Sequence, residues 1–370
     1  MRVKYLNFIE QWKEESRDLL PLINKVLSSG KYIGINTEDI IKFENKVSKI
    51  CNTKNCITLN SGTDALTLAL YANGISKDDE VITVSNSYIA TVGSIIHLKA
   101  KPIFVDVNDD LNINPKLIES SITKKTKAIM PVHLTGRMCD METINQIAKK
   151  YKLKVIEDAA QSFGAKFNNK ICGSHNNITC FSAHPLKNLN AIGDAGFMTL
   201  NNFNLAGRIS KLKNHGLKTR DHLEEFGYNS RLDNVQAAIL NFRLNKYKKY
   251  INLRRKNAKI YNSLIDKSFA ILPEEKKEEF NTYHTYIIQT PNRSKLINYL
   301  KSNNIDTYIH YPVPAHMQQY YKKNFRNFKP LPNTAKQSKT ILSLPINHSL
   351  KKNKIEYVAK KINYFYKYLS

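Results

Sequence analysis

Short apolar segments rich in β-branched residues alternate with amphipathic segments between about residues 55 and 200. Short apolar runs predict buried strands, whereas apolar positions three or four residues apart predict helices. Strands are predicted over residues 56–60, 81–85, 102–107, 128–133, 154–157, 178–182 and 196–200. Helices are predicted between the earlier strands, over residues 65–72, 91–98, 115–122 and 141–151. This alternation predicts an α/β fold with a large, mostly parallel sheet that helices cover on both faces.

The pattern changes in the last third of the chain. One long helix is predicted over residues 233–264, with Asp233 as its capping residue. Beyond Pro273 we predict a strand, a helix, an extended segment and a closing amphipathic helix, over residues 283–290, 295–302, 307–311 and 355–368. These elements predict a smaller α+β domain over residues 250–370. Residues 1–249 would then form the large domain and an N-terminal helical arm, over residues 1–30, that packs on the smaller domain.

The composition is typical of a folded protein. Of the 370 residues, 42% are hydrophobic and 24% are charged. The five cysteines are scattered and form no CxxC pair, which argues against a disulfide scaffold or a zinc ribbon, and we expect no metal site. No apolar run approaches the roughly 18–20 residues of a membrane span. The first twenty residues carry acidic side chains where a signal peptide would be apolar, so we expect a cytoplasmic protein with no membrane partner.

The net charge of +26 comes from 57 lysines and arginines against 31 acidic residues. A surplus of this size favours a polyanionic partner where the basic residues cluster. Here the lysines are distributed along the whole chain, in doublets beside amphipathic segments, as on solvated helix faces. We therefore expect no nucleic-acid partner, although a basic DNA-binding regulator remains the alternative from another class of protein. The same charge would attract a small anionic substrate.

The first polar segment that could carry chemistry is Ser61-Gly62-Thr63, where a predicted strand ends and a predicted helix begins. The N-terminus of a helix leaves N–H groups unpaired and carries the positive end of the helix dipole, which favours an anion. An ordinary N-cap by serine or threonine explains the same residues. The segment alone does not decide between an anion site and a cap.

Two further polar segments follow predicted strands. Asp158 stands at the carboxyl end of a strand, where open α/β sheets bind ligands, and could either hold a proton on a heteroaromatic nitrogen or cap the following turn. Lys187 lies between a strand and a glycine-containing turn, with neutral neighbours. A lysine buried in a pocket has a lowered pKa and can attack a carbonyl, whereas most lysines of this chain are solvated. His184 is the other reactive side chain of this segment, or a hydrogen-bonded structural histidine.

Together, an anion cradle, a carboxylate and a buried lysine are the groups that pyridoxal phosphate needs, and they occur here in one α/β unit. Further motifs run along nearly the whole chain, at residues 32–34, 43–44, 61–63, 131–136, 157–162, 180–196, 214–216, 227–233, 236–238, 310–316 and 343–345. With these motifs the sequence resembles the DegT/StrS family of aminotransferases that act on nucleotide-linked ketosugars. The resemblance implies the aspartate-aminotransferase-type fold (type I), with a large domain that binds pyridoxal phosphate and a small C-terminal domain.

The resemblance also implies roles for residues around the cofactor. Lys187 would hold the cofactor covalently and move a proton during catalysis. Asp158 would pair with the ring nitrogen, Gln161 would contact the ring hydroxyl, and Tyr88 would lie over the ring. The residues that would hold the phosphate are Gly62, Thr63 and Ser182.

Other residues would complete the site from a second subunit or on the substrate side. Asn229 resembles the residue that reaches the phosphate from the neighbouring subunit, which implies a homodimer with shared active sites. The residues that match the segment near the sugar nucleotide are His310, Tyr311 and His316.

The implied reaction transfers an amino group from glutamate to a nucleotide-linked ketosugar. The pattern Lys-Asn-Leu-x-Ala-x-Gly-Asp from Lys187 is similar to members that aminate C3 of a dTDP-3-oxo-6-deoxyhexose, giving a dTDP-3-amino-3,6-dideoxyhexose for a surface glycan. The alternative is amination at C4 of a UDP-, dTDP- or GDP-4-oxo-6-deoxyhexose. Ala183 and Ala195 replace a usual aromatic residue and a usual glycine, which leaves the preferred sugar open. Related sugar dehydratases carry histidine in place of the lysine, so Lys187 favours transamination.

Overall fold

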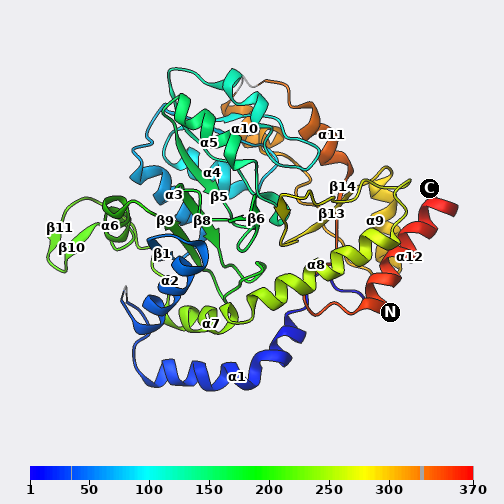
Figure 1. Ribbon diagram of the computed structural model, residues 1–370, viewed down its shortest axis with the longest axis horizontal. Coiled ribbons are helices and arrows are strands. Elements are labelled where there is room, and N and C mark those ends of the chain that lie inside the picture. Colours follow the sequence, from blue (N-terminus) through cyan, green and yellow to red (C-terminus); the bar gives the residue numbers. More distant parts are fainter. Residues whose placement is uncertain (35, 326–328, 370) are drawn as a thin grey trace.

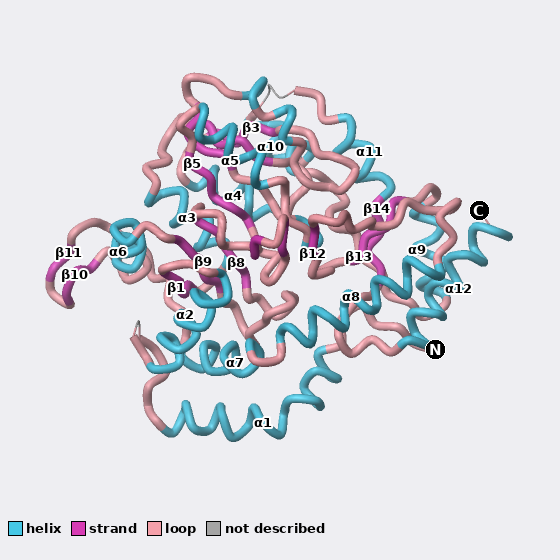
Figure 2. Tube along the Cα trace, in the orientation of Figure 1, coloured by secondary structure: helices cyan, strands magenta, loops and turns pink. Residues whose placement is uncertain are grey.

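The computed structural model describes residues 1–34, 36–325 and 329–369, and within them a sheet of seven strands forms the centre of the molecule (Figure 1, Figure 2). The strands are β1 (Asn55–Leu59), β2 (Glu80–Thr83), β3 (Lys101–Phe104), β4 (Thr126–Ile129), β5 (Lys154–Asp158), β8 (Ile178–Ser182) and β9 (Gly196–Leu200). They lie in the order β1-β9-β8-β5-β4-β2-β3. Strand β9 runs antiparallel to β1 and β8, and the other neighbours pair in parallel. The prediction of a large, mostly parallel sheet is confirmed.

Helices cover both faces of this sheet because its strands are apolar on both sides. One face packs against α3 (Gly62–Ala72), α4 (Ile89–His97) and α6 (Phe203–Leu212). The other face packs against α2 (Glu38–Cys51), α5 (Met141–Lys150) and α7 (Asn234–Leu244). Neighbouring residues of a strand point to opposite faces. In β9, for example, Phe197 points to the face beside α2, α5 and α7, and Met198 points to the face beside α3, α4 and α6.

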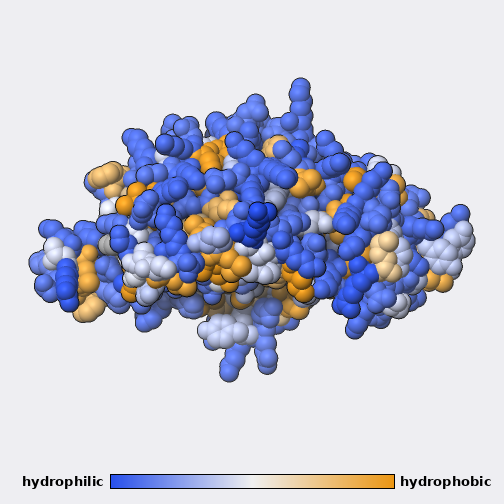
Figure 3. Space-filling view, turned by 90° about the horizontal axis from the view of Figure 1, so that it is seen from below, coloured by the Kyte–Doolittle hydropathy of each residue, from blue (hydrophilic) through white to orange (hydrophobic). Residues whose placement is uncertain are grey.

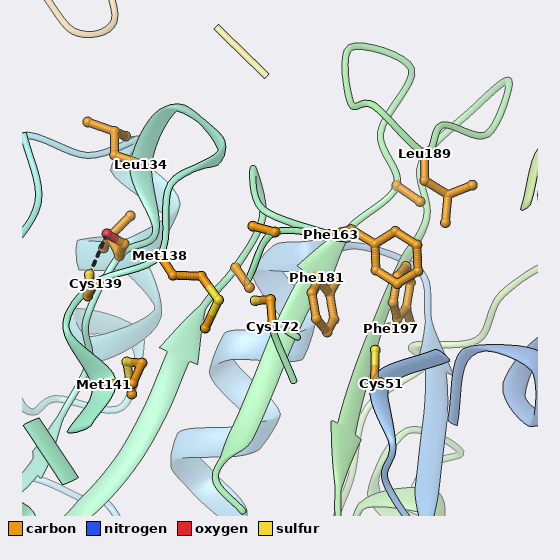
Figure 4. Close-up of a cluster of buried hydrophobic side chains, with 14 of the residues drawn as sticks. Cys51, Leu134, Met138, Cys139, Met141, Phe163, Cys172, Phe181, Leu189 and Phe197 are labelled. Carbon is orange, nitrogen blue, oxygen red and sulfur yellow. Dashed lines mark hydrogen bonds between the residues drawn. The ribbon is translucent and has the colours of Figure 1, made fainter. Parts of the chain in front are cut away.

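The core beside α2, α5 and α7 is rich in aromatic and sulfur-containing side chains (Figure 4). The rings of Phe181 and Phe197 stack with their centroids 4.9 Å apart, and Phe163 packs edge-on against both. The cysteines are all buried and free: Cys51, Cys56, Cys139, Cys172 and Cys180. Burial raises the pKa of the Cys51 thiol to about 12 and the pKa values of the other four well above their ordinary value.

A second core lies at the end of the molecule where both termini are found (Figure 1). It is built from α8 (Tyr247–Leu264), β13 (Tyr286–Gln289), α9 (Arg293–Ser302), β14 (Ile341–Leu344) and α12 (Lys352–Tyr368). Helix α8 belongs to both cores, because Ile251 packs in the large core and Tyr261 in the second. The division at residue 249/250 therefore stays a prediction, since it falls within a helix that the two cores share.

The predicted helix over residues 233–264 is wrong in one respect, because the structure contains two helices, α7 and α8. The break falls at Asn245 and Lys246, and no Gly or Pro marks it. It redirects the chain from the large core to the second core. The predicted helix over residues 115–122 is also wrong. Two 3₁₀ turns, η1 (Pro115–Leu117) and η2 (Glu119–Ser121), stand there, because so short a segment with little apolar surface cannot hold an α-helix.

The segment between β13 and β14 returns to the large sheet. It contains η4 (Ala315–Met317), α10 (Gln319–Asn324) and α11 (Pro332–Thr340). Tyr321 and Leu331 pack against Phe104 of β3, and the carboxylate of Asp106 accepts hydrogen bonds from the backbone N–H and the hydroxyl of Thr334. This segment therefore connects the two cores beside the carboxyl ends of the strands.

The remaining elements lie at the edges. The N-terminal arm forms α1 (Phe8–Ser28), which packs along α7, while Val3 ahead of it joins the second core. The short elements are η3 (Leu134–Gly136), the small sheet of β6 (Lys166–Phe167), β7 (Lys170–Ile171) and β12 (Glu279–Phe280), and the hairpin of β10 (Leu217–Thr219) and β11 (His222–Leu223). The hairpin projects from the body at the far end from the termini (Figure 1). Within the described residues, no helix has both the length and the apolar character that a membrane crossing requires.

Candidate active site

The carboxyl ends of three parallel strands meet where β1, β8 and β5 finish. Ser61 follows β1, Ser182 ends β8 and Asp158 ends β5. Gly62 lies against Ser182 so closely that a Cβ on Gly62 would come within 2.7 Å of the Ser182 Cβ. A side chain at position 62 would therefore push the two segments apart. Ligands of open α/β sheets bind at such strand ends.

The first turn of α3 offers N–H groups at this edge. The Ser61 hydroxyl accepts a hydrogen bond from the Asp64 N–H at 3.1 Å, so Ser61 is the N-cap. In the described part of the chain, the N–H groups of Gly62 and Thr63 have no hydrogen-bond acceptor. The cap and the anion site are thus compatible, because one serine caps the helix and leaves two donors for an anion.

Asp158 is buried, with 5% of its surface exposed. Its Oδ1 accepts a hydrogen bond from the Ala160 N–H at 3.2 Å, and its Oδ2 accepts one from the Thr91 hydroxyl at 2.6 Å. Thr91 is in turn bonded to Ser87 at 2.6 Å. Asp158 therefore stabilises the turn after β5, as the simpler explanation had it, and is also fixed in place by α4.

Lys187 lies in the loop between β8 and β9 and is half-buried. Burial lowers the pKa of its ammonium, while the nearby charge of Asp158 opposes this by raising it. Its Nζ donates no hydrogen bond to any residue of the described chain. A lysine with a lowered pKa and a free Nζ can present a neutral amine to a carbonyl group.

Gln161 links the turn after β5 to the chain between the two cores. Its Oε1 accepts a hydrogen bond from the Thr135 N–H at 2.8 Å, and its Nε2 donates to the Tyr311 hydroxyl at 3.2 Å. The centroids of the Tyr311 and Tyr88 rings are 6.0 Å apart. Tyr88 is 58% exposed, so part of its ring is accessible for stacking.

The remaining predicted residues differ in position. His310 bonds Ser343 through Nδ1 at 2.8 Å and lies close enough to Lys187 for that charge to help lower its pKa. His316 is buried, bonds the Ser85 hydroxyl at 2.6 Å and packs against the Phe104 ring. Asn229 is exposed, and its Oδ1 accepts a hydrogen bond from Arg231. No contact within the described chain joins Asn229 to the other candidate residues.

Sequence reasoning missed two residues of this site. His284 lies within reach of Lys187, and its Nδ1 is 3.4 Å from the Asn188 Oδ1. Burial, aided by the charge of Lys187, lowers the pKa of His284 well below its ordinary value. Arg254 is buried behind it and donates to the carbonyls of Tyr283 and Ile346, and burial lowers its pKa to about 10. The sequence gives no local indication that either residue belongs to the site, because the predicted strand over residues 283–290 contains His284 and the predicted helix over residues 233–264 contains Arg254.

The charge state of His310 predicts a loss of stability in acid. Burial lowers its pKa to about 4, so below the ordinary value of about 6.5 the unfolded chain takes up a proton that the folded chain does not. The free energy of unfolding should therefore fall between pH 6.5 and 4, by at most about 1.4 kcal/mol per pH unit from this residue. Chemical denaturation at several pH values should show a shallower decline for His310→Asn. The same change at the exposed His97 should leave the slope as it is, and an equal effect of both variants would contradict the prediction.

Two other features lie near the site but outside it. A cleft of about 900 Å³ is lined by Thr135 and Tyr283, but by neither Lys187 nor Asp158. His133, Glu157 and Cys172 are buried with potential ligand atoms within 4.8 Å of one another. The His133 Nδ1 accepts a hydrogen bond from the Cys139 N–H, so its Nε2 carries the proton and donates to Glu157. A metal would need that Nε2 unprotonated, so the cluster is arranged for hydrogen bonding.

The donor set fits pyridoxal phosphate. Free N–H groups beside Ser182 suit a phosphate, the buried carboxylate of Asp158 suits a protonated ring nitrogen, and the amine of Lys187 suits an aldehyde. A fold of this topology with these groups at its strand ends defines the class of aminotransferase-type enzymes that depend on this cofactor.

Comparison with known proteins gives the family. The model of the DegT/DnrJ/EryC1/StrS aminotransferase family matches residues 13–363. The chain belongs to this family. The predictions of the family, of the fold class and of an aminotransferase that depends on pyridoxal phosphate are thereby confirmed.

Individual relatives match along nearly their whole length. The dTDP-3-amino-3,6-dideoxy-alpha-D-galactopyranose transaminase of Aneurinibacillus thermoaerophilus is 40% identical over 350 residues, 94% of this chain and 95% of that protein. A protein named a pleiotropic regulatory protein, from Geobacillus stearothermophilus, is 37% identical over 374 residues and covers both chains completely. The solved structure of Streptomyces venezuelae DesV with a ketimine intermediate superposes with a TM-score of 0.96, at 32% identity and full coverage of both chains.

Proposed function

We propose that the chain transfers an amino group from glutamate to C3 of a dTDP-3-oxo-6-deoxyhexose. The product would be a dTDP-3-amino-3,6-dideoxyhexose, made in the cytoplasm for a surface glycan. The observation that carries the proposal is the A. thermoaerophilus relative, which is named for a sugar with its amino group at carbon 3. The pattern that begins at Lys187 supports the same carbon. The comparisons give no support to a DNA-binding regulator.

Two groups of this chain, Asp158 and Lys187, would perform the chemistry together with the cofactor. Pyridoxal phosphate, when bound, supplies the electron sink that stabilises charge on the carbon beside the amino group. Asp158 would keep the ring nitrogen protonated, because it is a buried carboxylate fixed by Thr91. Lys187 would hold the cofactor and then move a proton between the substrate carbon and the cofactor, because its lowered pKa leaves the amine free to accept a proton.

The polar groups around these residues would orient cofactor and substrate. The N–H groups of Gly62 and Thr63, with the hydroxyl of Ser182, would bind the phosphate. Gln161 would contact the hydroxyl group of the cofactor ring. The exposed ring of Tyr88 would stack on the cofactor ring. On the substrate side, we propose that Tyr311 and His310 contact the sugar nucleotide. His316 would act indirectly, because its hydrogen bond to Ser85 holds their segment in place.

We also propose that two subunits share each active site. Asn229 is exposed, and no hydrogen bond joins it to the other cofactor residues within the described chain, as expected if it serves a partner. Ile89, Leu186 and Ile192 expose apolar surface around the site, which a second subunit would cover. Figure 3, which views the molecule from below, shows a face that is mostly hydrophilic with apolar patches near its centre.

A complementation experiment tests the shared site. Asn229→Ala and Lys187→Ala subunits should each be inactive as homodimers. Mixed after subunit exchange in equal amounts, they should recover about a quarter of the wild-type activity, because half of the dimers carry one intact site. Asp158→Asn mixed with Lys187→Ala serves as the control, because both residues lie in the same subunit's part of the site and their mixture forms no intact site. Absence of recovery in the Asn229→Ala mixture would contradict the shared site.

A substrate panel tests the reaction itself. Purified protein, pyridoxal phosphate and glutamate should be incubated with dTDP-3-oxo- and dTDP-4-oxo-6-deoxyhexoses, and with the UDP and GDP 4-oxo sugars. Mass spectrometry should show the gain of an amino group, and NMR should place it on C3. Amination at C4 would select the alternative aminotransferase. Protein that stays colourless with the cofactor and binds duplex DNA with sequence preference would replace the enzyme by the regulator.

A further inference from the structure

The loop that carries Lys187 is fixed at its base by backbone hydrogen bonds. The Ala191 N–H donates to the Ala183 carbonyl at 2.7 Å, and the Lys187 N–H donates to the His184 carbonyl at 2.8 Å. On one flank the Asn188 side chain donates to the Thr282 carbonyl at 3.2 Å. The other flank of the loop is held by the N-terminal helix α1, nearly 180 residues away in the sequence.

Gln11 of α1 and Asn190 of the loop form a reciprocal amide pair. Each side chain donates one hydrogen bond to the other, and both distances are 3.2 Å. Asn190 uses its second N–H on the Pro185 carbonyl at 2.9 Å, which closes the loop around Lys187. Both amides are buried, so loss of either partner would leave a buried polar group unpaired.

The register of α1 is set one turn further along by a buried ion pair. Both Nε and Nη2 of Arg243 donate to one carboxylate oxygen of Glu15, at 3.0 and 2.7 Å. The remaining Nη1 of Arg243 donates to the carbonyls of Asn190 and Ala191, at 2.8 and 3.1 Å. Neither side chain has a solvated alternative, because Glu15 is fully buried and Arg243 nearly so. Polar groups buried in this way fix one register rather than several.

We propose that α1 is part of the catalytic machinery, because Gln11 and Glu15 act as positioning residues for Lys187. The inference rests on the proposed role of Lys187. Gln11 holds Asn190 three residues beyond the lysine, and Glu15 orients the arginine that binds the same stretch of backbone. A lysine that forms and breaks a covalent bond has no permanent hydrogen bond of its own, so its loop must be held by neighbours. The structure assigns that task to the arm.

The test uses variants of the amide pair, because removal of the buried Glu15–Arg243 pair would risk unfolding. Gln11→Ala and Asn190→Ala should each lower kcat roughly ten- to a hundredfold while KM for glutamate changes little, since a small displacement of the lysine affects the reaction more than binding. The double variant should be no worse than either single variant. The exchanged pair, Gln11→Asn with Asn190→Gln, retains two facing amides and should recover much of the lost activity.

Two readouts do not depend on turnover. In cofactor-free protein, hydrogen–deuterium exchange of residues 183–195 should become roughly tenfold faster in Gln11→Ala. In holoenzyme, the pH at which the cofactor's absorbance changes should shift, because that pH reports the surroundings of the lysine. Leu19→Ala is the matched control: Leu19 is a buried residue of the same helix, and no hydrogen bond joins it to the loop in the described structure. Leu19→Ala should reduce the free energy of unfolding but change neither the hydrogen–deuterium exchange of residues 183–195 nor the pH at which the absorbance changes.

The outcomes separate this inference from the proposed function. Unchanged exchange and unchanged absorbance in Gln11→Ala would overturn the positioning role while leaving the enzyme assignment intact. The same holds if Leu19→Ala reproduces both effects, since general loosening of the arm would then explain them. If the cofactor binds another lysine, the proposed function fails by itself, and the inference loses its catalytic meaning even if the exchange result shows that α1 holds the loop.

Discussion

Lys187→Ala should abolish turnover with glutamate and a keto sugar, with a loss of roughly 10²–10⁴-fold or more in kcat, because the variant lacks the amine that we propose moves the proton. It should still bind the cofactor through the groups at the N-terminus of α3, but without a covalent bond. Borohydride reduction of the wild-type holoenzyme, followed by digestion and mass spectrometry, should find the cofactor on the peptide that contains Lys187. The reduced variant should release the cofactor on unfolding.

A second lysine with a lowered pKa provides the internal control. Burial also lowers the pKa of Lys213, but its Nζ donates to the Thr58 carbonyl at 2.9 Å and lies 3.7 Å from a carboxylate oxygen of Glu44. The two lysines therefore differ in whether the amine already donates a hydrogen bond. Reduction should leave the Lys213 peptide unlabelled, and cofactor found on Lys213 or any other lysine would refute the assignment of Lys187.

Asp158→Asn should lower kcat by roughly 10²–10³-fold, the cost of removing a fixed group that stabilises developing charge. The variant keeps the shape of the side chain and an oxygen that can accept from Thr91, so the folded state should remain intact. Its amide does not hold a proton on the ring nitrogen, which removes the electron sink. Steady-state kinetics and the absorbance spectrum of the bound cofactor at several pH values would measure both effects.

Thr91→Val gives the graded control for this carboxylate. The change removes the 2.6 Å hydrogen bond to Asp158 but leaves the charge, so the loss in kcat should be well below that of Asp158→Asn. If Asp158→Asn retained wild-type kcat and spectrum, the carboxylate would only stabilise the turn through Ala160. If Thr91→Val were as damaging as Asp158→Asn, position rather than charge would be what the site needs.

The central sheet could be predicted from sequence because buried parallel strands are apolar on both sides, and each predicted range overlaps an observed strand. The ranges are less exact where apolar burial continues past the strand. The apolar run at 102–107 outlasts β3 because Val105 and Val107 remain buried in the following loop. Helix α2 was not among the predicted elements, although Ile40, Phe43 and Val47 mark one helical face. The break between α7 and α8 has no local cause, so only the two cores that these helices enter explain it.

The candidate site was predictable to the extent that its residues follow strands of one parallel sheet. The positions of Gly62, Asp158 and Ser182 at one edge follow from that rule. The contribution of Gln11 could not be predicted, because a glutamine on an amphipathic helix predicts a solvated face. His284 was hidden in the same way, within a segment that alternates like a strand. Gln11 contacts Asn190 and His284 contacts Asn188, and such tertiary contacts leave no pattern in the sequence.

The burial of every cysteine gives the protein a built-in reporter of unfolding. A thiol reagent such as Ellman's reagent needs an accessible thiolate, and the folded chain offers neither access nor a low thiol pKa. The thiols of the native enzyme should therefore react with the reagent only as fast as the fold opens, until all five thiols have reacted. A single cysteine introduced on the β10–β11 hairpin could accordingly carry a fluorophore without removal of any native thiol, and would follow subunit exchange directly.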